Sequence, residues 1–305
     1  MTSRPRSVPA PTEATSSGPG LRGWLGLVYA AGVYLGFLAV LGYVIGFVAQ
    51  IGVPKGIDDG PQDSALRASL IDAGLLGLFA VQHSVMARPW FKRAWTRLVS
   101  VPLERATYVL CASLLLAVLI WGWRPIHGTV WHITGISTGV LHTGYVVGWL
   151  MAIGSTFMIN HADLFGLRQA WLAARGIPYT PPAFTERSLY RWIRHPLNAG
   201  FIIAFWSSPS MSLGHLLFAT GATGYIIVGI ALEEHDLQRQ FGQAYTAYRA
   251  RVPALLPISS RRHKPSGGDV GGAVRPQHLP DGPAGGAAGA DRPKLDAVNG
   301  GDHGK

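Results

Sequence analysis

Charged residues are scarce in this chain of 305 residues: they make up 14% of it, against about a quarter in ordinary soluble domains. Together with 48% hydrophobic residues gathered in long uncharged blocks, this excludes an ordinary soluble domain and indicates an integral membrane protein. Cysteine is rarer still, and because Cys111 is the only one, no disulfide framework can form within the chain. The first uncharged block, 23–54, is too long for a signal-peptide core and has no clear small-residue cleavage site after it, so we expect a retained span.

The uncharged blocks predict an all-α membrane protein with about six membrane segments, which are four spans and a C-terminal helical hairpin. The spans are expected at roughly 24–49, 68–87, 106–123 and within 137–160. Between Arg194 and Glu233 lie 38 residues without a formal charge. As straight helix they would measure about 57 Å, nearly twice the roughly 30 Å hydrocarbon core. Pro209 interrupts this run, so we expect a hairpin there, with a kink in one tilted span as the alternative.

Four regions follow from this organisation. We expect a disordered N-terminal arm at 1–20, spans one to four within 21–162, a connector, hairpin and cofactor-binding region at 163–257, and a disordered tail at 258–305. The arm is rich in Pro, Ser, Thr and Gly, and the tail in Gly, Ala and Pro, compositions that cannot bury a core.

The net charge of +10 would suit a nucleic-acid partner, but the basic residues lie in short loops between apolar blocks. The segments on one side of the predicted spans hold 19 Lys and Arg residues, and the opposite loops hold 3. By the positive-inside rule, both termini and the connector are predicted to be cytoplasmic. We therefore expect membrane lipid, and no nucleic acid, as a partner.

Two polar segments bracket the predicted hairpin, and the first is the loop 194–200. His195 precedes Pro196, which disfavours helical backbone at the histidine. Gly200 would let a ligand or a neighbouring helix come close, and a helix beginning near Asn198 would offer free N–H groups to a carboxylate. The alternative is a plain interfacial loop.

The second polar segment begins with Glu233 and Glu234, where the hairpin would leave the membrane. Glu234, Leu237, Phe241, Tyr245 and Tyr248 follow a spacing of three to four residues, which predicts one shared helix face. Packing accounts for the leucine and the phenylalanine, whereas the carboxylate and the tyrosines suit hydrogen bonds to a ligand. Solvated residues at a membrane exit are the alternative.

Read together, these pieces resemble a known family. Arg194-His195-Pro196-x-Asn198-x-Gly200, Glu233-Glu234-x-x-Leu237, Phe241-Gly242, Tyr245-x-x-Tyr248 and Arg251-Val252-Pro253 are similar to the signature of isoprenylcysteine carboxyl methyltransferases and their bacterial relatives. Asn198 departs from that pattern, which usually has tyrosine or a similar residue.

Within the same superfamily, which also includes NnrU-like proteins, the resemblance is closer to the bacterial methanethiol S-methyltransferases. It is carried by Asn160-His161-Ala162-Asp163-Leu164-Phe165-Gly166-Leu167-Arg168-Gln169, by 196–198, by 206–219 and by 82–89. Those enzymes make dimethyl sulfide in the bacterial inner membrane. The resemblance therefore implies a multi-pass enzyme there, with a small volatile thiol as substrate. No obligate protein partner is evident from the sequence.

The resemblance also implies the cofactor, S-adenosyl-L-methionine, held between the loop and the following helix. The implied cofactor-binding residues are Arg194, His195, Pro196, Asn198, Gly200, Glu233, Glu234, Tyr245 and Tyr248. Which of them contacts the ribose, the adenine or the amino-acid end stays open, and we single out no metal site. Arg251 or a helix N-terminus suits the cofactor carboxylate.

Thiol methylation is favoured by a group that takes the thiol proton, and histidine has a suitable pKa. His161 is our first candidate, with Asp163 expected to orient its ring, and His83 is the second. In the isoprenylcysteine enzymes the counterpart of Arg251 would pair with a substrate carboxylate, so methylation of a carboxyl group or of another thiol is an alternative.

Two other classes of function stay open at this point. A haem-binding NnrU-like protein, such as an isomerase or a nitrogen-oxide-associated factor, would need two span histidines at matching depth, and His83 with His161 is a candidate pair. A scaffold or transporter is a further alternative, although no internal repeat is detectable and the polar residues gather at one face of the membrane.

Overall fold

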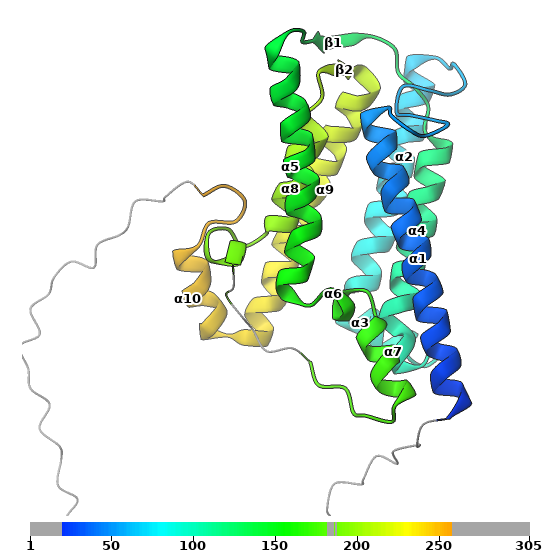
Figure 1. Ribbon diagram of the computed structural model, residues 1–305, viewed down its shortest axis with the longest axis vertical. Helices are drawn as coiled ribbons and strands as arrows, with labels where there is room; N and C mark the ends of the chain where they lie inside the picture. Colours follow the sequence, from blue (N-terminus) through cyan, green and yellow to red (C-terminus); the bar gives the residue numbers. More distant parts are fainter. Residues whose placement is uncertain (1–19, 182–185, 187, 258–305) are drawn as a thin grey trace, which may run out of the picture. The chain divides into compact units, whose positions relative to one another are not determined.

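The computed structural model describes residues 20–181, 186 and 188–257 (Figure 1). Within these residues, five helices are long and apolar enough to cross a membrane: α1 (Leu21–Ala49), α2 (Ala65–Ala87), α4 (Glu104–Gly122) with the preceding η1 (Val101–Leu103), α5 (Ile136–Ile159) and α9 (Leu213–Phe241). A shorter apolar helix is α8 (Pro196–Trp206). The other elements are α3 (Pro89–Trp95), α6 (His161–Leu164), α7 (Leu167–Ala174), η2 (Ser188–Arg191), α10 (Gln243–Arg251) and the strands β1 (Thr129–His132) and β2 (Ser210–Ser212).

The predicted class, a multi-pass helical membrane protein, is confirmed by these helices, and the four predicted spans match α1, α2, α4 and α5 closely. The short antiparallel pairing of β1 with β2 was not predicted from the sequence. The arm and tail expected at 1–20 and 258–305 lie outside the described residues, apart from Gly20.

The helices pack in neighbouring pairs. Helix α1 packs against α4 and α7, α2 against α4 and α9, and α5 against α8. A cluster of buried rings joins several of these pairs: Phe218 of α9 lies 5.7 Å from Trp123 and 5.0 Å from Phe205, between ring centroids. Phe47 of α1 contacts the same tryptophan edge to face at 6.4 Å. Such offset and edge-to-face pairs stabilise the helix arrangement beyond their burial.

The segment between α8 and α9 is a turn, as the hairpin interpretation predicted. The Trp206 Nε1–H donates to Thr223 Oγ1 at 3.0 Å, and the Arg194 side chain reaches Glu234. The end of α8 therefore lies beside the earlier part of α9, and the residue before α8 lies beside the later part of α9. The two helices are thus antiparallel. Figure 1 shows β2 at the turn between them. A kink in one continuous span is excluded by this pairing.

Close contact between α5 and α8 holds α8 in place, and two glycines permit it. A Cβ built on Gly200 would lie 2.6 Å from the backbone nitrogen of Ala152 and from the carbonyl oxygen of Gly148. A Cβ on Gly148 would lie 2.6 Å from the nitrogen of Ala204. Backbones can approach this closely only where the side chain is hydrogen. Gly200 thus admits a neighbouring helix, which is one of the two uses expected from the sequence.

Candidate active site

The loop that precedes α8 is fixed by the chain segment that follows α10. The backbone N–H of Arg194 donates to the Pro253 carbonyl at 2.9 Å, and that of His195 donates to the Ala254 carbonyl at 3.0 Å. Pro196 then occupies the first turn of α8, where a missing N–H costs nothing. The C-terminal segment therefore positions the two polar side chains that enter the site.

Helix α9 does not continue into α10. Gly242, at φ +55°, separates them in a conformation that glycine adopts without strain. The expectation that Glu234, Tyr245 and Tyr248 share one face of a single helix is therefore wrong. The break changes which side chains of α10 face α9.

Glu234 is the centre of a buried charge cluster, with 5% of its surface exposed. Its Oε1 lies 2.6 Å from Arg194 Nη2 and 3.1 Å from His195 Nε2, and its Oε2 lies 3.2 Å from Arg249 Nε. Arg194 also donates through Nη1 to the carbonyls of Val252 and, at 3.1 Å, Arg249. The predicted meeting of the two polar segments is thus present, and it ties α8, α9 and α10 together.

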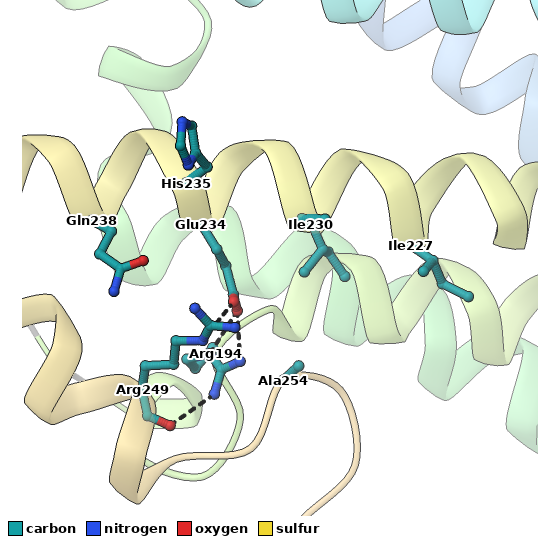
Figure 2. A pocket seen from close by; sticks show the side chains of 9 residues that line it. Arg194, Ile227, Ile230, Glu234, His235, Gln238, Arg249 and Ala254 are labelled. Atoms are coloured by element: carbon teal, nitrogen blue, oxygen red, sulfur yellow. Dashed lines mark hydrogen bonds and ion pairs between the residues drawn. The ribbon is translucent and has the colours of Figure 1, made fainter.

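A cavity of about 320 Å³ opens beside this cluster. Its lining is Arg194, Ile227, Ile230, Ala231, Glu234, His235, Gln238, Arg249 and Ala254. Figure 2 shows Ile227, Ile230, Glu234 and Gln238 projecting from one side of α9 toward the arginines and Ala254. The volume lies at the lower end of the range for small-molecule pockets.

The cavity combines two kinds of wall. At one end two guanidinium groups surround a single carboxylate, which leaves an excess of positive charge for an anionic ligand group. At the other end Ile227, Ile230 and Ala231 offer an apolar surface. An elongated ligand with a carboxylate at one end and a flat apolar group at the other fits these walls.

The predicted cofactor residues fall into two groups. Arg194 and Glu234 line the cavity, and His195 bonds Glu234. Glu233 is about half exposed, with Oε2 3.6 Å from His195 Nδ1. The remaining five residues are not among the lining residues: Pro196, Asn198, Tyr245, Tyr248 and Gly200, the last of which packs against α5. The cofactor roles of all of them stay predictions.

Tyr245 and Tyr248 belong to a small hydrophobic cluster with Leu237, Phe241 and Val252. The Tyr248 hydroxyl donates to the Tyr190 carbonyl at 2.7 Å, which anchors α10 to η2. Burial raises the pKa of each of these two tyrosines to about 12, so both stay protonated at neutral pH. Both rings therefore help to pack α10, and a cofactor role for either tyrosine stays a prediction.

His161 lies in a second polar site, at the start of α6. Its Nδ1 is 2.7 Å from Thr156 Oγ1, and its Nε2 is 2.6 Å from the Tyr34 hydroxyl. The Thr156 hydroxyl donates its proton to the Ile153 carbonyl, so it accepts a hydrogen bond from Nδ1–H. We assign the neutral tautomer with the proton on Nδ1, which leaves Nε2 as the acceptor of the Tyr34 hydroxyl proton.

Asp163 does not orient that ring, contrary to expectation. Its carboxylate accepts instead from Arg168 Nη1 at 3.0 Å and from the Tyr179 hydroxyl at 3.1 Å. Both ring nitrogens of His161 are occupied by Tyr34 and Thr156. The aspartate therefore fastens the connector, and its expected part in catalysis loses its geometric basis.

His83 lies apart, among the rings of Phe79, Tyr108 and Tyr225 at centroid distances of 5.0 to 6.3 Å. Its Nδ1 has no hydrogen-bond partner among the described residues. No described residue joins its ring to that of His161, whose partners come from α1 and α5. The structure thus does not bring these two histidines together by any direct contact.

Known proteins are similar to this chain over most of its length. A methanethiol S-methyltransferase of Mycobacterium tuberculosis is 48% identical over 242 residues, covering 79% of this chain and 99% of the relative. Another from Pseudomonas deceptionensis is 46% identical over 245 residues, covering 80% and 93%. The chain belongs to the methanethiol S-methyltransferase family. Nurim of Xenopus laevis is more distant, at 27% identity over 217 residues that cover 67% of this chain and 71% of the relative.

No family model and no solved structure matches the chain. Methanethiol S-methyltransferases at this identity favour the thiol interpretation over the haem-binding and isoprenylcysteine alternatives. Membership in the family also makes the chain a methyltransferase relative that needs a methyl donor, for which the charged cavity is the candidate site.

Of the nine residues that line the cavity, only Arg194 and Glu234 were predicted as site residues, and the predicted Arg251 is not among the nine. Arg251 does not line the cavity, and its Nη2 pairs with Glu186 at 3.1 Å while 63% of its side chain is exposed. Arg249 contacts Glu234 instead. Since the phase of α10 depends on the break at Gly242, sequence periodicity could not choose between them. The spacing of Ile227, Ile230, Ala231, Glu234 and Gln238 on α9 could have identified the rest of the wall.

Proposed function

We propose that this protein transfers the methyl group of S-adenosyl-L-methionine to methanethiol and so produces dimethyl sulfide. The observation that carries the proposal is near-complete coverage of a methanethiol S-methyltransferase at 48% identity, together with a charged cavity formed by the segments that the sequence implied. The donor supplies an activated methyl on a positive sulfonium. The thiolate sulfur forms a bond to that carbon, and the old S–C bond breaks with its electron pair kept by the departing sulfide.

The cavity residues suit the donor. Arg249, half exposed and paired through Nε, has its other nitrogens available for the donor carboxylate, and Arg194 adds charge beside it. Glu234 can accept from an amine or a ribose hydroxyl. Ile227 and Ile230 suit the adenine ring. Holding the donor by both ends orients its methyl group, which is the main contribution a protein makes to an in-line displacement.

His161 is proposed to take the thiol proton through Tyr34. The Tyr34 hydroxyl would give its proton to Nε2 and receive the proton of the thiol, so the thiolate forms as the imidazole becomes charged. Burial lowers the pKa of His161, so the ring is neutral and able to accept at neutral pH. Thr156 holds the tautomer that leaves Nε2 free for this task.

A pH profile tests this relay. The protonated imidazole cannot accept, so the wild-type rate will fall as pH drops through the lowered pKa, below about 6.5. His161→Gln and Tyr34→Phe will each lower the rate by about 10²-fold or more, and the residual rate will lack that acid limb. Tyr43→Phe on the same helix is the control. A limb unchanged in His161→Gln would assign the proton transfer elsewhere.

The compartment is part of the proposal. We place the protein in the bacterial inner membrane with both termini and the cavity cytoplasmic, supported by the 19 to 3 distribution of Lys and Arg. The partners proposed are the volatile thiol and the surrounding lipid, with no obligate protein partner. A small apolar thiol partitions into the bilayer, so the membrane itself can deliver it.

The central test compares two arginines on α10. Cells that express the wild type and receive methanethiol will release dimethyl sulfide, measured by headspace gas chromatography. Arg249→Gln will lower the rate of the purified enzyme by about 10- to 100-fold, because it removes charge-assisted contacts to the donor. Arg251→Gln, two residues away and paired outside the cavity, will keep nearly full activity.

Each arm of this comparison can fail separately. If the wild type and Arg249→Gln are active and Arg251→Gln is inactive, the donor does not bind at Arg249, and the proposed donor site is wrong. A well-inserted wild type that makes no dimethyl sulfide would remove methanethiol as the acceptor. Transfer of label from S-adenosyl-L-methionine methyl groups then decides whether the chain methylates another acceptor.

A further inference from the structure

The segment 88–105, which runs from the end of α2 to the first turn of α4, is strongly basic. Its charged residues are five cations and one carboxylate: Arg88, Lys92, Arg93, Arg97, Arg105 and Glu104. We propose that Lys92 and Arg105, with Arg88 beside them, bind the phosphate of an anionic phospholipid at the membrane surface. This names the lipid partner of the proposed function more closely and rests on its membrane placement. The test below measures lipid binding and not methylation, so the two proposals can fail separately.

The fold brings the three cations to one corner. Helices α2 and α4 pack together in antiparallel order, and the Tyr108 hydroxyl donates to the His83 carbonyl at 3.2 Å. About one turn further toward the same end of both helices lie Arg105 on α4 and Arg88 at the end of α2. The backbone N–H of Lys92 on α3 donates to the Arg88 carbonyl at 3.0 Å, which places these two residues next to each other.

Two of the three cations have no ion-pair partner. Arg88 pairs with Asp236 of α9 at 2.9 Å. Neither Lys92 nor Arg105 makes an ion pair or a side-chain hydrogen bond with any described residue. Burial lowers the pKa of Lys92 and the charge of Arg105 lowers it further, while Glu104 and Asp236 offset only part of this shift. An anion beside the lysine would therefore stabilise its charged form.

Both cationic groups can be reached from outside the protein. Among the described residues, the buried side-chain atoms that lack a partner include no atom of Lys92 or Arg105, so the charged ends of both are accessible. Lysine offers three N–H donors and arginine five, and phosphate oxygens accept from both. A phosphate group can thus bond the two side chains at once.

Exposed apolar side chains on the same segment favour a phospholipid over a free phosphate. Trp90 is 56% exposed, Leu98 81% and Val101 72%. Tryptophan is enriched where membrane and water meet, and basic residues next to a spanning helix attract anionic headgroups. A phospholipid would place its phosphate at the cations and its acyl chains along apolar side chains of this kind. A free phosphate offers nothing to them.

The experiment follows the thermal midpoint of the purified full chain in neutral detergent as phosphatidylglycerol is added. Phosphatidylcholine with the same acyl chains is the reference. A ligand that binds only the folded state raises the midpoint, and the titration gives its apparent affinity. Phosphatidylglycerol will bind wild type about tenfold or more tightly than phosphatidylcholine does. Lys92→Gln and Arg105→Gln will each weaken this binding by about fivefold, the contribution of one cation near an anionic lipid.

Arg93→Gln is the matched control, because Arg93 is an exposed cation on the same short helix and has no place in the cluster. It will change the affinity for phosphatidylglycerol by less than about twofold. Lys92→Gln removes no ion pair, so its midpoint without lipid will stay at the wild-type value or rise.

Three results would overturn the lipid site. Equal losses in Arg93→Gln and Lys92→Gln would show a general attraction to the basic surface and no defined site. Equal stabilisation by the two lipids would show that charge plays no part. Inorganic phosphate that stabilises wild type as well as phosphatidylglycerol does would assign the cations to a free anion. Dimethyl sulfide formation is measured separately, so each of these results leaves the proposed function standing.

Discussion

Replacement of Glu234 by leucine will lower the free energy of unfolding by about 3–5 kcal/mol, even without any ligand. The carboxylate compensates the guanidinium of Arg194, whose side chain is 10% exposed, at 2.6 Å. Once it is gone, the buried Arg194 guanidinium keeps only the Arg249 and Val252 carbonyls as hydrogen-bond partners among the described residues. For a domain of this size the thermal midpoint in detergent will fall by about 6–20 °C. The ten tryptophans provide the fluorescence signal.

A double variant separates the ion pair from the rest of the cluster. In Arg194→Met, Glu234→Leu both charges are absent, so the loss will be smaller than the sum of the two single losses. The exposed pair Arg251 and Glu186 is the control, since removal of either partner will cost about 0–1 kcal/mol. Additive losses at Arg194 and Glu234 would show that the two side chains are not coupled in the folded protein.

The buried ion pair also gives the binding site a fixed geometry. Glu234 and Arg194 are fixed before a ligand arrives, because backbone bonds from Pro253 and Ala254 hold the loop and His195 bonds the same carboxylate. A site that is already ordered loses little entropy when the donor binds. Arg249, the more exposed member, is the one free to adjust to the ligand.

The helices and the turn could be predicted from the sequence because both follow from the length and charge of its segments. Uncharged blocks of sufficient length gave the spans, and a run too long for one crossing with Pro209 inside gave the hairpin. The meeting of Arg194 with Glu234 then followed from the topology. None of these inferences needs knowledge of side-chain orientation.

The site contacts that could not be predicted all depend on side-chain orientation or on residues far apart in the sequence. The conformation of Gly242 breaks the helix and changes the orientation of α10, so that Arg249, and not the predicted Arg251, contacts Glu234. Tyr34 is 127 residues from His161, so no local pattern could pair them, and the nearby Asp163 was a natural but wrong choice. The partner of the His161 ring was expected close by in the sequence, whereas contacts between distant helices determine it.

Replacement of Gly200 by alanine is expected to have the second large effect on stability. Its two possible roles, close packing against α5 or contact with the cofactor, predict different changes in the thermal midpoint. If it admits α5, Gly200→Ala will force α5 and α8 apart, since the new Cβ would lie 2.6 Å from backbone atoms that cannot rotate away. Such overpacking typically costs about 1–3 kcal/mol, and the displaced α8 would carry Arg194 and His195 out of place. Thermal stability without ligand and activity will therefore fall together.

Gly154→Ala on α5 is the matched control for this experiment. A Cβ there meets nothing within 4 Å, so the same chemical change will be neutral or will stabilise the helix by about 0.5–1 kcal/mol. Two glycine-to-alanine substitutions in the α5–α8 pair thus change stability in opposite directions. If Gly200→Ala instead keeps its thermal midpoint and only weakens binding of S-adenosyl-L-methionine, the glycine faces the cofactor, as the family resemblance implied, and the close approach of α5 is not what selects it.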